Sequence, residues 1–255
     1  MRIIVCCFVL TLSMLSPLEG MAGIRHTPEK DAPAVSSEQT ESSESPEQAA
    51  LKAYNEGVRL FFASQSTVTQ TVAGVYRLQQ DAKKQFKIAL RLNPALLEAE
   101  SNLGYVELAQ KNPKKALNHF EQALKLNATH EASLAGLGIV LDQTNRSNEA
   151  IERLTQLTQL YPEKEQHWFN LGTIYQAQQA HENAINAYQQ SLLRNPKHLP
   201  SLFNLATIYH DLKQPKNAWM FYQRCIQSDP GTPLALQAQH RVTSLQKQFP
   251  DILAP

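Results

Sequence analysis

The sequence is poor in cysteine, glycine and aromatic residues. Of its 255 residues, 3 are cysteine and 9 are glycine, and aromatic residues make up 7%. Cys6 and Cys7 stand in an apolar leader, so Cys225 would be alone in a processed chain and could form no internal disulfide. A disulfide framework is therefore excluded, and we expect Cys225 to be a small buried residue in a domain that is stable through packing.

An excess of one charge is also missing, and so are catalytic motifs. Lys and Arg number 24 against 23 for Asp and Glu, and this balance gives no basic footprint for nucleic acid. The sequence contains no GxGxxG, no HExxH, and no CxxC beyond the leader, and its histidines are scattered. The sequence therefore predicts a protein that is not an enzyme, holds no metal or cofactor and does not bind nucleic acid.

Long apolar runs are absent except at the amino terminus. Arg2 is followed by a run without acidic residues that ends at Leu15, before Ser16 and Pro17. The run is shorter than the roughly 20 residues of a membrane span. Residues 1–22 therefore predict a cleavable signal peptide and a periplasmic or secreted protein, with no membrane insertion of the mature chain. An uncleaved amino-terminal anchor is the alternative.

The next segment, residues 23–48, is rich in Pro, Ser, Glu, Gln and Thr. It carries five acidic residues after Lys30 and no basic one: Asp31, Glu38, Glu41, Glu44 and Glu47. Such a composition cannot bury enough apolar surface to order itself, so we expect a solvated acidic tether.

The remainder of the chain repeats itself with a period of 34 residues. Four classes of position recur at that step: Gly104, Gly138, Gly172 and Ala206; Ala116, Ala150, Ala184 and Ala218; Phe120, Leu154, Tyr188 and Tyr222; Pro162, Pro196 and Pro230. The full pattern appears once, as Trp168-x-x-Leu171-Gly172-x-x-Tyr175, Ala184-x-x-x-Tyr188 and Pro196, and it resembles the tetratricopeptide repeat family. In such a pattern the small residues let two antiparallel helices approach closely, and proline ends the second helix.

The resemblance implies an all-α fold, a right-handed superhelical solenoid of antiparallel helix pairs over residues 49–249. Five repeats are expected, at about 50–95, 97–130, 131–164, 165–198 and 199–232. A capping helix over 233–249 should cover the last repeat, because apolar residues recur there at helical spacing between polar ones. Residues 250–255 form a tail.

The first repeat contains an insertion. Gly57 and Ala82 are 25 residues apart, where the matching positions of later repeats are 12 apart. The insert includes the weak helix formers Ser64–Val72, so we expect a protruding loop with extended helix ends. Insertions in repeat arrays can lie on the binding side or be tolerated surface loops, and the sequence leaves both open.

The first helix of each repeat lines the concave face in this family, so the resemblance implies a peptide groove there. Asparagine stands two residues before the small residue in four repeats, at Asn55, Asn102, Asn170 and Asn204, and Gly136 interrupts the series. An amide can donate to a carbonyl and accept from an N–H, so a row of amides can bind the backbone of an extended peptide. This arrangement is similar to the asparagine ladder of the O-linked N-acetylglucosamine transferase repeats. Alternatively, each amide bonds to the neighbouring helix.

Aromatic residues complete the candidate groove: Tyr54, Tyr105, Phe169 and Phe203. Such side chains can anchor a ligand or pack in the core. The inward positions carry no Lys or Arg of the kind with which chaperone-binding relatives clamp a terminal carboxylate. The sequence thus predicts a scaffold that binds an extended segment of a partner protein in its groove, in envelope assembly or traffic. The alternative is a docking or self-association module, with a possible homo-oligomer, acting through the convex face or the repeat-one insert.

Overall fold

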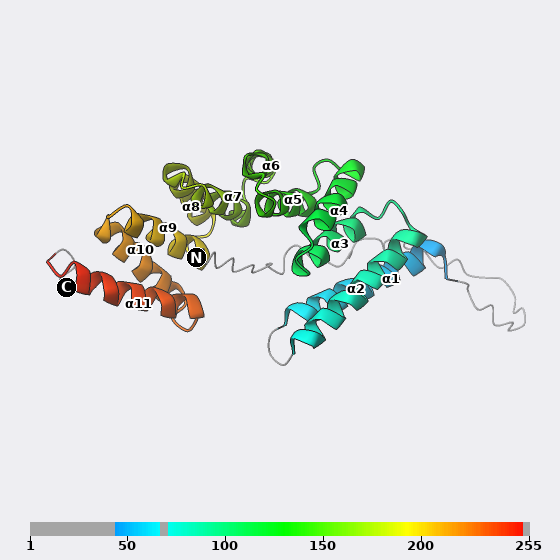
Figure 1. Ribbon diagram of the computed structural model, residues 1–255, viewed down its shortest axis with the longest axis horizontal. Helices are drawn as coiled ribbons and strands as arrows, with labels where there is room; N and C mark the ends of the chain where they lie inside the picture. The colour runs from blue at the N-terminus through cyan, green and yellow to red at the C-terminus, as the bar shows by residue number, and fades with distance from the viewer. Residues whose placement is uncertain (1–43, 67–70, 252–255) are drawn as a thin grey trace, which may run out of the picture. The chain divides into compact units, whose positions relative to one another are not determined.

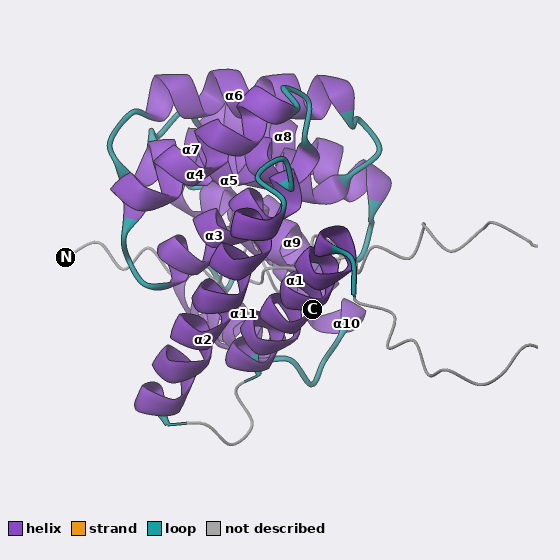
Figure 2. Ribbon diagram, turned by 90° about the vertical axis from the view of Figure 1, so that its right-hand side faces the viewer, coloured by secondary structure: helices purple, strands orange, loops and turns teal. Residues whose placement is uncertain are grey.

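The computed structural model describes residues 44–66 and 71–251, and within these ranges it contains eleven helices and no strand. Figure 2 shows the helices and the loops that join them. The chain divides into two compact units, Met1–Lys111 and Asn112–Pro255, which are described separately. The expected signal peptide 1–22 lies outside the described residues, as do residues 23–43 of the expected tether and the last four residues of the tail.

The first unit contains α1 (Pro46–Gln65), α2 (Val72–Leu92) and α3 (Leu97–Ala109). Helices α1 and α2 form an antiparallel hairpin, and α2 also packs against α3 (Figure 1). A capping box starts α1: Gln48 N–H donates to Ser45 Oγ, and Ser45 N–H donates to the Gln48 side chain. The helix therefore begins inside the segment expected to be tether.

Most of the insertion in the first repeat is helical. Helices α1 and α2 have 20 and 21 residues, whereas α3 to α10 have 13 or 14. Ser64 lies within α1, where its hydroxyl donates to the Phe61 carbonyl at 2.6 Å. Thr71 caps α2 by accepting from Gly74 N–H at 3.1 Å. The extended helix ends were expected, but the residues treated as a loop are partly helical because local hydrogen bonds offset their weak propensity.

The second unit contains eight helices. They are α4 (Pro113–Leu126), α5 (Glu131–Gln143), α6 (Ser147–Leu160), α7 (Glu165–Ala177), α8 (His181–Arg194), α9 (Leu199–Asp211), α10 (Pro215–Ser228) and α11 (Pro233–Gln248). Each helix of the unit packs against the next one along the chain. This is the stacking of a helical repeat solenoid, which confirms the all-α fold class.

The small residues of the repeat make room for the large ones. Leu154 and Tyr188 are both 0% exposed. A Cβ added to Gly138 would lie only 2.6 Å from the Leu154 side chain, and one added to Gly172 only 2.7 Å from the Tyr188 ring. An alanine at either glycine would therefore displace a fully buried side chain, which costs about 1–3 kcal/mol.

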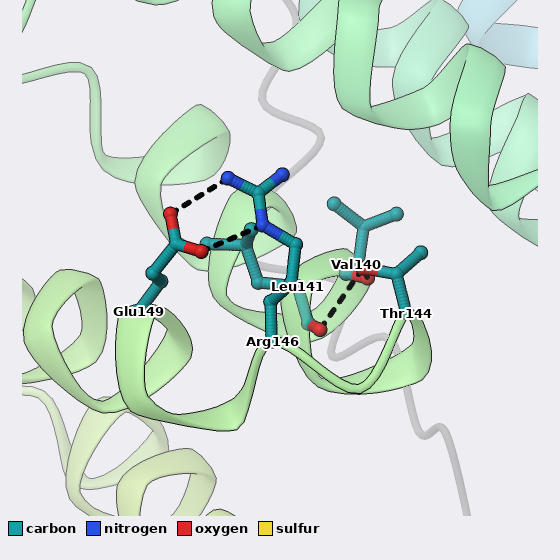
Figure 3. Close-up of polar contacts among 5 residues, drawn as sticks. All are labelled: Val140, Leu141, Thr144, Arg146 and Glu149. Carbon is teal, nitrogen blue, oxygen red and sulfur yellow. Dashed lines mark hydrogen bonds and ion pairs between the residues drawn. The ribbon is translucent and has the colours of Figure 1, made fainter.

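A second 34-residue pattern lies in the turns between paired helices. The backbone is left-handed at Lys111, Asn145, Gln179 and Lys213, where φ is 59° or 60°. Asn145 N–H donates to Asp142 O at 3.0 Å, and Arg146 N–H donates to Leu141 O at 2.9 Å, as in a Schellman motif. Figure 3 shows this turn, with Thr144 directed back onto the carbonyls of α5 and Arg146 facing Glu149. Glycine is the usual residue at such a position, and its absence hid the pattern in the sequence.

Helix α1 carries charged residues at two positions that are buried in the corresponding later helices. Helices α3, α5, α7, α9 and α11 each bury a residue at two equivalent positions. The first position holds Ala99, Ser133, His167, Ser201 and Ala235, and the second holds Val106, Val140, Ile174, Ile208 and Val242. In α1 these positions hold Lys52 and Arg59, whose side chains are 77% and 67% exposed and pair with Glu44 and Glu56. This face of α1 is therefore solvated rather than stacked.

Polar residues close the stack at its last helix. Helix α11 packs on the unit through Ala235, Ala238, Val242 and Leu245, all buried. Where α7 has Leu171, Gly172 and Tyr175 for packing against its paired helix, α11 has Gln239, His240 and Thr243, all exposed. The positions that pack on a paired helix in α7 are thus polar and exposed in α11.

Candidate functional site

Helices α7 and α9 of the second unit carry the same three residues at equivalent positions. Phe169, Asn170 and Thr173 of α7 recur 34 residues later as Phe203, Asn204 and Thr207 of α9. All six are half-buried, and we call them the α7–α9 face. Helices α7 and α9 are in contact, so the two sets lie on adjacent helices of one unit.

A tyrosine hydroxyl behind this face joins three helices. Tyr188 of α8 is 0% exposed, and its hydroxyl donates to Gln176 Oε1 of α7 at 2.7 Å. The same oxygen accepts from Asn204 Nδ2 of α9 at 3.0 Å and lies 3.5 Å from Thr173 Oγ1. The hydroxyl therefore fixes the orientation of the Asn204 amide.

Asn170 is held differently, because the preceding repeat offers no hydroxyl. Leu154 stands where the next repeat has Tyr188, and Asn170 Oδ1 instead accepts from Gln166 Nε2 at 2.9 Å. Within the described residues, Asn170 Nδ2 and Asn204 Oδ1 have no hydrogen-bond partner. One amide donor and one amide acceptor thus remain on adjacent helices.

The threonine hydroxyls of the face are already engaged. Thr173 donates to Phe169 O and Thr207 to Phe203 O, both at 3.0 Å. Thr207 Oγ1 also lies 3.1 Å from the Tyr222 hydroxyl. The two amides are therefore the main polar groups that the face can offer.

The phenylalanines of the face pack edge-on against neighbouring rings. Phe169 lies 5.1 Å from the His198 ring at 70°, and Phe203 lies 5.4 Å from the Tyr222 ring at 64°. Both phenylalanines are half-buried. Each ring thus packs in the unit and leaves part of its surface exposed.

In the first unit, two candidate residues contact each other. Asn102 is 5% exposed, and its Nδ2 donates to the Tyr54 hydroxyl at 3.3 Å. Burial, helped by the charge of Glu98, raises the pKa of Tyr54 to about 12. Tyr105 is also buried, at 5% exposed, whereas Asn55 is exposed. The eight candidates therefore differ widely in their access to solvent.

Gly136, which interrupts the asparagine series, has a packing role. A Cβ at Gly136 would collide with the ring of Phe120, the large residue of the preceding helix α4. Asn204 contacts Tyr188, the corresponding residue of α8. The residue at the asparagine position is thus matched to the large residue of the preceding repeat, a pairing that the sequence pattern did not reveal.

His198, His130 and Cys225 lie in packing contacts. His198 Nδ1 is 2.8 Å from Ser201 Oγ, and burial lowers the pKa of His198 although Glu165 opposes the shift. The pair His130 and Ser133 repeats this contact at 2.8 Å. Cys225 is buried, and burial raises the pKa of its thiol to about 11.

The described residues contain no group of three His, Cys, Asp or Glu side chains that could hold a metal ion. Over the same residues, none of the helices combines the length and apolar character needed to cross a membrane.

Comparison of the sequence with known families gives three matches, all described as tetratricopeptide repeat. They cover residues 95–163, 136–200 and 199–232. A search of curated protein sequences gave no match.

Several solved structures share the fold. PilF of Pseudomonas aeruginosa has a TM-score of 0.64 and 20% identity, covering 82% of this chain and 93% of its own. YrrB, described as a TPR protein with an unusual peptide-binding site, has a TM-score of 0.53 and 19% identity over 75% of this chain and 98% of its own. MamA of Desulfovibrio magneticus RS-1 has a TM-score of 0.56 and 17% identity over 70% of this chain and 98% of its own.

Identities this low show a common fold and nothing more. The sequence matches carry the family assignment, because together they span residues 95–232, more than half of the chain. The stacked helices and the small residues packed against large ones agree with these sequence matches. The chain therefore belongs to the tetratricopeptide repeat family.

Proposed function

We propose that this protein is a non-catalytic scaffold that holds an extended, uncharged segment of a partner protein on the α7–α9 face. Proteins of this family are generally interaction scaffolds without catalytic activity. The observation that carries the proposal is the pair of available amide atoms, Asn170 Nδ2 and Asn204 Oδ1, on adjacent helices. A peptide backbone presents a carbonyl to the first and an N–H to the second.

The chemistry of the face indicates the kind of segment. None of the six residues is charged, so the face provides no partner for a terminal carboxylate or a basic side chain. The exposed parts of Phe169 and Phe203 favour apolar side chains. YrrB, which shares the fold, is described as having a peptide-binding site, and this supports a peptide ligand here.

The affinity of such peptides tests the proposal. Peptides selected from a random library on the purified protein would be titrated by calorimetry against the wild type and the N170A/N204A variant. Two lost hydrogen bonds, each worth about 0.5–1.5 kcal/mol, should weaken binding at least about 5-fold. The matched control is N183A/N186A, which removes two exposed asparagines from α8 and should bind normally. Unchanged affinity in a folded N170A/N204A variant would overturn the proposal.

We further propose that the scaffold acts in the cell envelope, on the basis of the leader at residues 1–22. An alkaline phosphatase fused after residue 30 should be active in bacteria, because this enzyme folds only after export to an oxidising compartment. The same fusion without residues 1–22 should be inactive. Equal activity of the two fusions would contradict export by this leader.

A further inference from the structure

Helix α2 carries a row of basic residues on its exposed face. Arg77, Lys84 and Arg91 follow one another at intervals of seven residues, and Lys87 lies beside them. All four are exposed, and in the described part of the chain none of them forms an ion pair. Asp81 is the acidic residue of this face. The near-neutral charge of the whole chain conceals this local excess.

The fifth basic residue of α2 has a different environment. Lys83 Nζ lies 2.5 Å from Glu107 Oε1 of α3, and the two side chains are only 16% and 2% exposed. Lys83 therefore fastens α2 to α3, while the other four point to solvent. The exposed charge does not serve the packing of the first unit.

Exposed apolar side chains lie at the adjoining end of the α1–α2 hairpin. Phe62, Val72 and Tyr76 are 42%, 89% and 56% exposed. The sequence between Arg59 and Arg77 contains no charged residue. The lengthened ends of α1 and α2 carry these residues (Figure 1). Exposed apolar side chains of α1 and α2 thus adjoin the basic face of α2.

We propose that the exposed face of α2, together with Phe62, Val72 and Tyr76, binds the surface of a membrane that contains anionic phospholipids. Peripheral helices that bind membranes combine basic residues, which meet the headgroups, with aromatic and aliphatic residues, which enter the interface. A soluble acidic partner would use the basic row but would give no role to Val72 and Tyr76. This surface lies in the first unit and goes beyond the peptide-binding function proposed for the second.

Vesicle binding tests this proposal. The chain from Gly23 onward would be used, because the apolar leader could itself bind lipid and every described helix lies beyond residue 43. Its partition onto vesicles of phosphatidylcholine, with and without 30% phosphatidylglycerol, would be measured by co-sedimentation. Binding should require phosphatidylglycerol and should weaken as salt is raised. Each basic residue near an anionic surface strengthens binding about 5-fold, so the R77Q/K84Q/K87Q/R91Q variant should bind at least about 100-fold more weakly.

The matched control removes the same charge elsewhere. K114Q/K115Q/K197Q/K216Q neutralises four exposed lysines of the second unit and should keep most of the binding. Circular dichroism of both variants verifies that they fold. An equal loss in the two variants would show an effect of total charge and overturn the assignment to α2.

A fluorescent variant tests the hairpin end. The wild type already emits from Trp168 and Trp219, so its spectrum is subtracted from that of Tyr76→Trp. The difference should shift to the blue on vesicles that contain phosphatidylglycerol, because an indole entering the interface leaves water. An unchanged difference spectrum on vesicles that bind the protein would refute a role for Tyr76 and its apolar neighbours.

A peptide of residues 31–47 tests the other occupant, the acidic segment of this chain. Saturable binding of that peptide, with no binding to either vesicle, would assign the α2 face to the acidic segment and overturn the membrane proposal.

Discussion

The Tyr188 hydroxyl joins three helices, so its removal gives a sensitive test of how the second unit is held together. In the Tyr188→Phe variant the ring keeps its place beside Gly172, and only one oxygen is lost. Phenylalanine already stands at the equivalent position in α4, as Phe120. We therefore expect no change of fold and a loss of stability that comes from hydrogen bonding.

The structure sets the size of this loss. Two short hydrogen bonds disappear, the one donated to Gln176 at 2.7 Å and the one accepted from Asn204 at 3.0 Å, together with the longer contact of 3.5 Å with Thr173. At about 0.5–1.5 kcal/mol each, the free energy of unfolding should fall by about 1–3 kcal/mol. For Tyr222→Phe, which loses one contact of 3.1 Å with Thr207, the expected loss is about half as large.

Urea unfolding followed by circular dichroism and by tryptophan fluorescence measures both variants. Trp168 of α7 and Trp219 of α10 report from two places in the unit, so coincident curves also test whether it unfolds in one step. A double-mutant cycle with Asn204→Ala isolates the bond between the two side chains. Additive effects in the cycle, or a Tyr188→Phe variant as stable as the wild type, would refute the role given to this hydroxyl.

Three further expectations concern turns, protonation and thiol reactivity. Replacing Gln179 by glycine should stabilise the protein by about 0.5–1 kcal/mol in thermal unfolding, since glycine adopts φ near 60° without the strain that a glutamine has there. Asn145→Gly should gain less, because asparagine tolerates this conformation better than glutamine does. Burial lowers the pKa of His198 from 6.5, so the unfolded chain takes up the proton first and the free energy of unfolding should fall as the pH drops below about 6.5. In urea titrations between pH 7.5 and 5, His198→Gln should lessen that fall. The same dependence of stability on pH in variant and wild type would refute the assignment. Cys225, whose pKa burial raises from 9.0 to about 11, should react with iodoacetamide at pH 8 roughly 100-fold more slowly in the folded protein than in urea, and equal rates would show that it is accessible.

The fold could be predicted because its contacts repeat. A small residue such as Gly172 and a large one such as Tyr188 recur at the same spacing, and each repeat solves the same packing problem. The left-handed turns also repeat, but Lys111, Gln179 and Lys213 give no local signal for this conformation. The extended helix ends at the insertion could be predicted, but the residues expected to form a loop are partly helical, because propensity is a weak guide where capping by residues such as Thr71 intervenes.

The candidate site was accessible to sequence reasoning only in part. The asparagine positions could be found by their period, but their contacts depend on the preceding helix. Asn204 meets a tyrosine hydroxyl, and Asn170 has only a leucine at that place. Tyr188 and Gln176, which orient the face from behind, lie on different helices and share no linear motif.

The two roles considered for the asparagines are compatible at some positions and not at others. Asn102 is 5% exposed and bonded to Tyr54, so an extended peptide cannot reach its amide without displacing part of the first unit. Asn204 also bonds to a neighbouring helix, but through Nδ2 alone, and the bond leaves Oδ1 in a fixed orientation. A hydrogen bond that holds an amide in place lowers the entropy lost when a ligand binds to its other half. Packing therefore opposes the proposed recognition at Asn102, whereas at Asn204 the packing contact orients the amide for the proposed ligand.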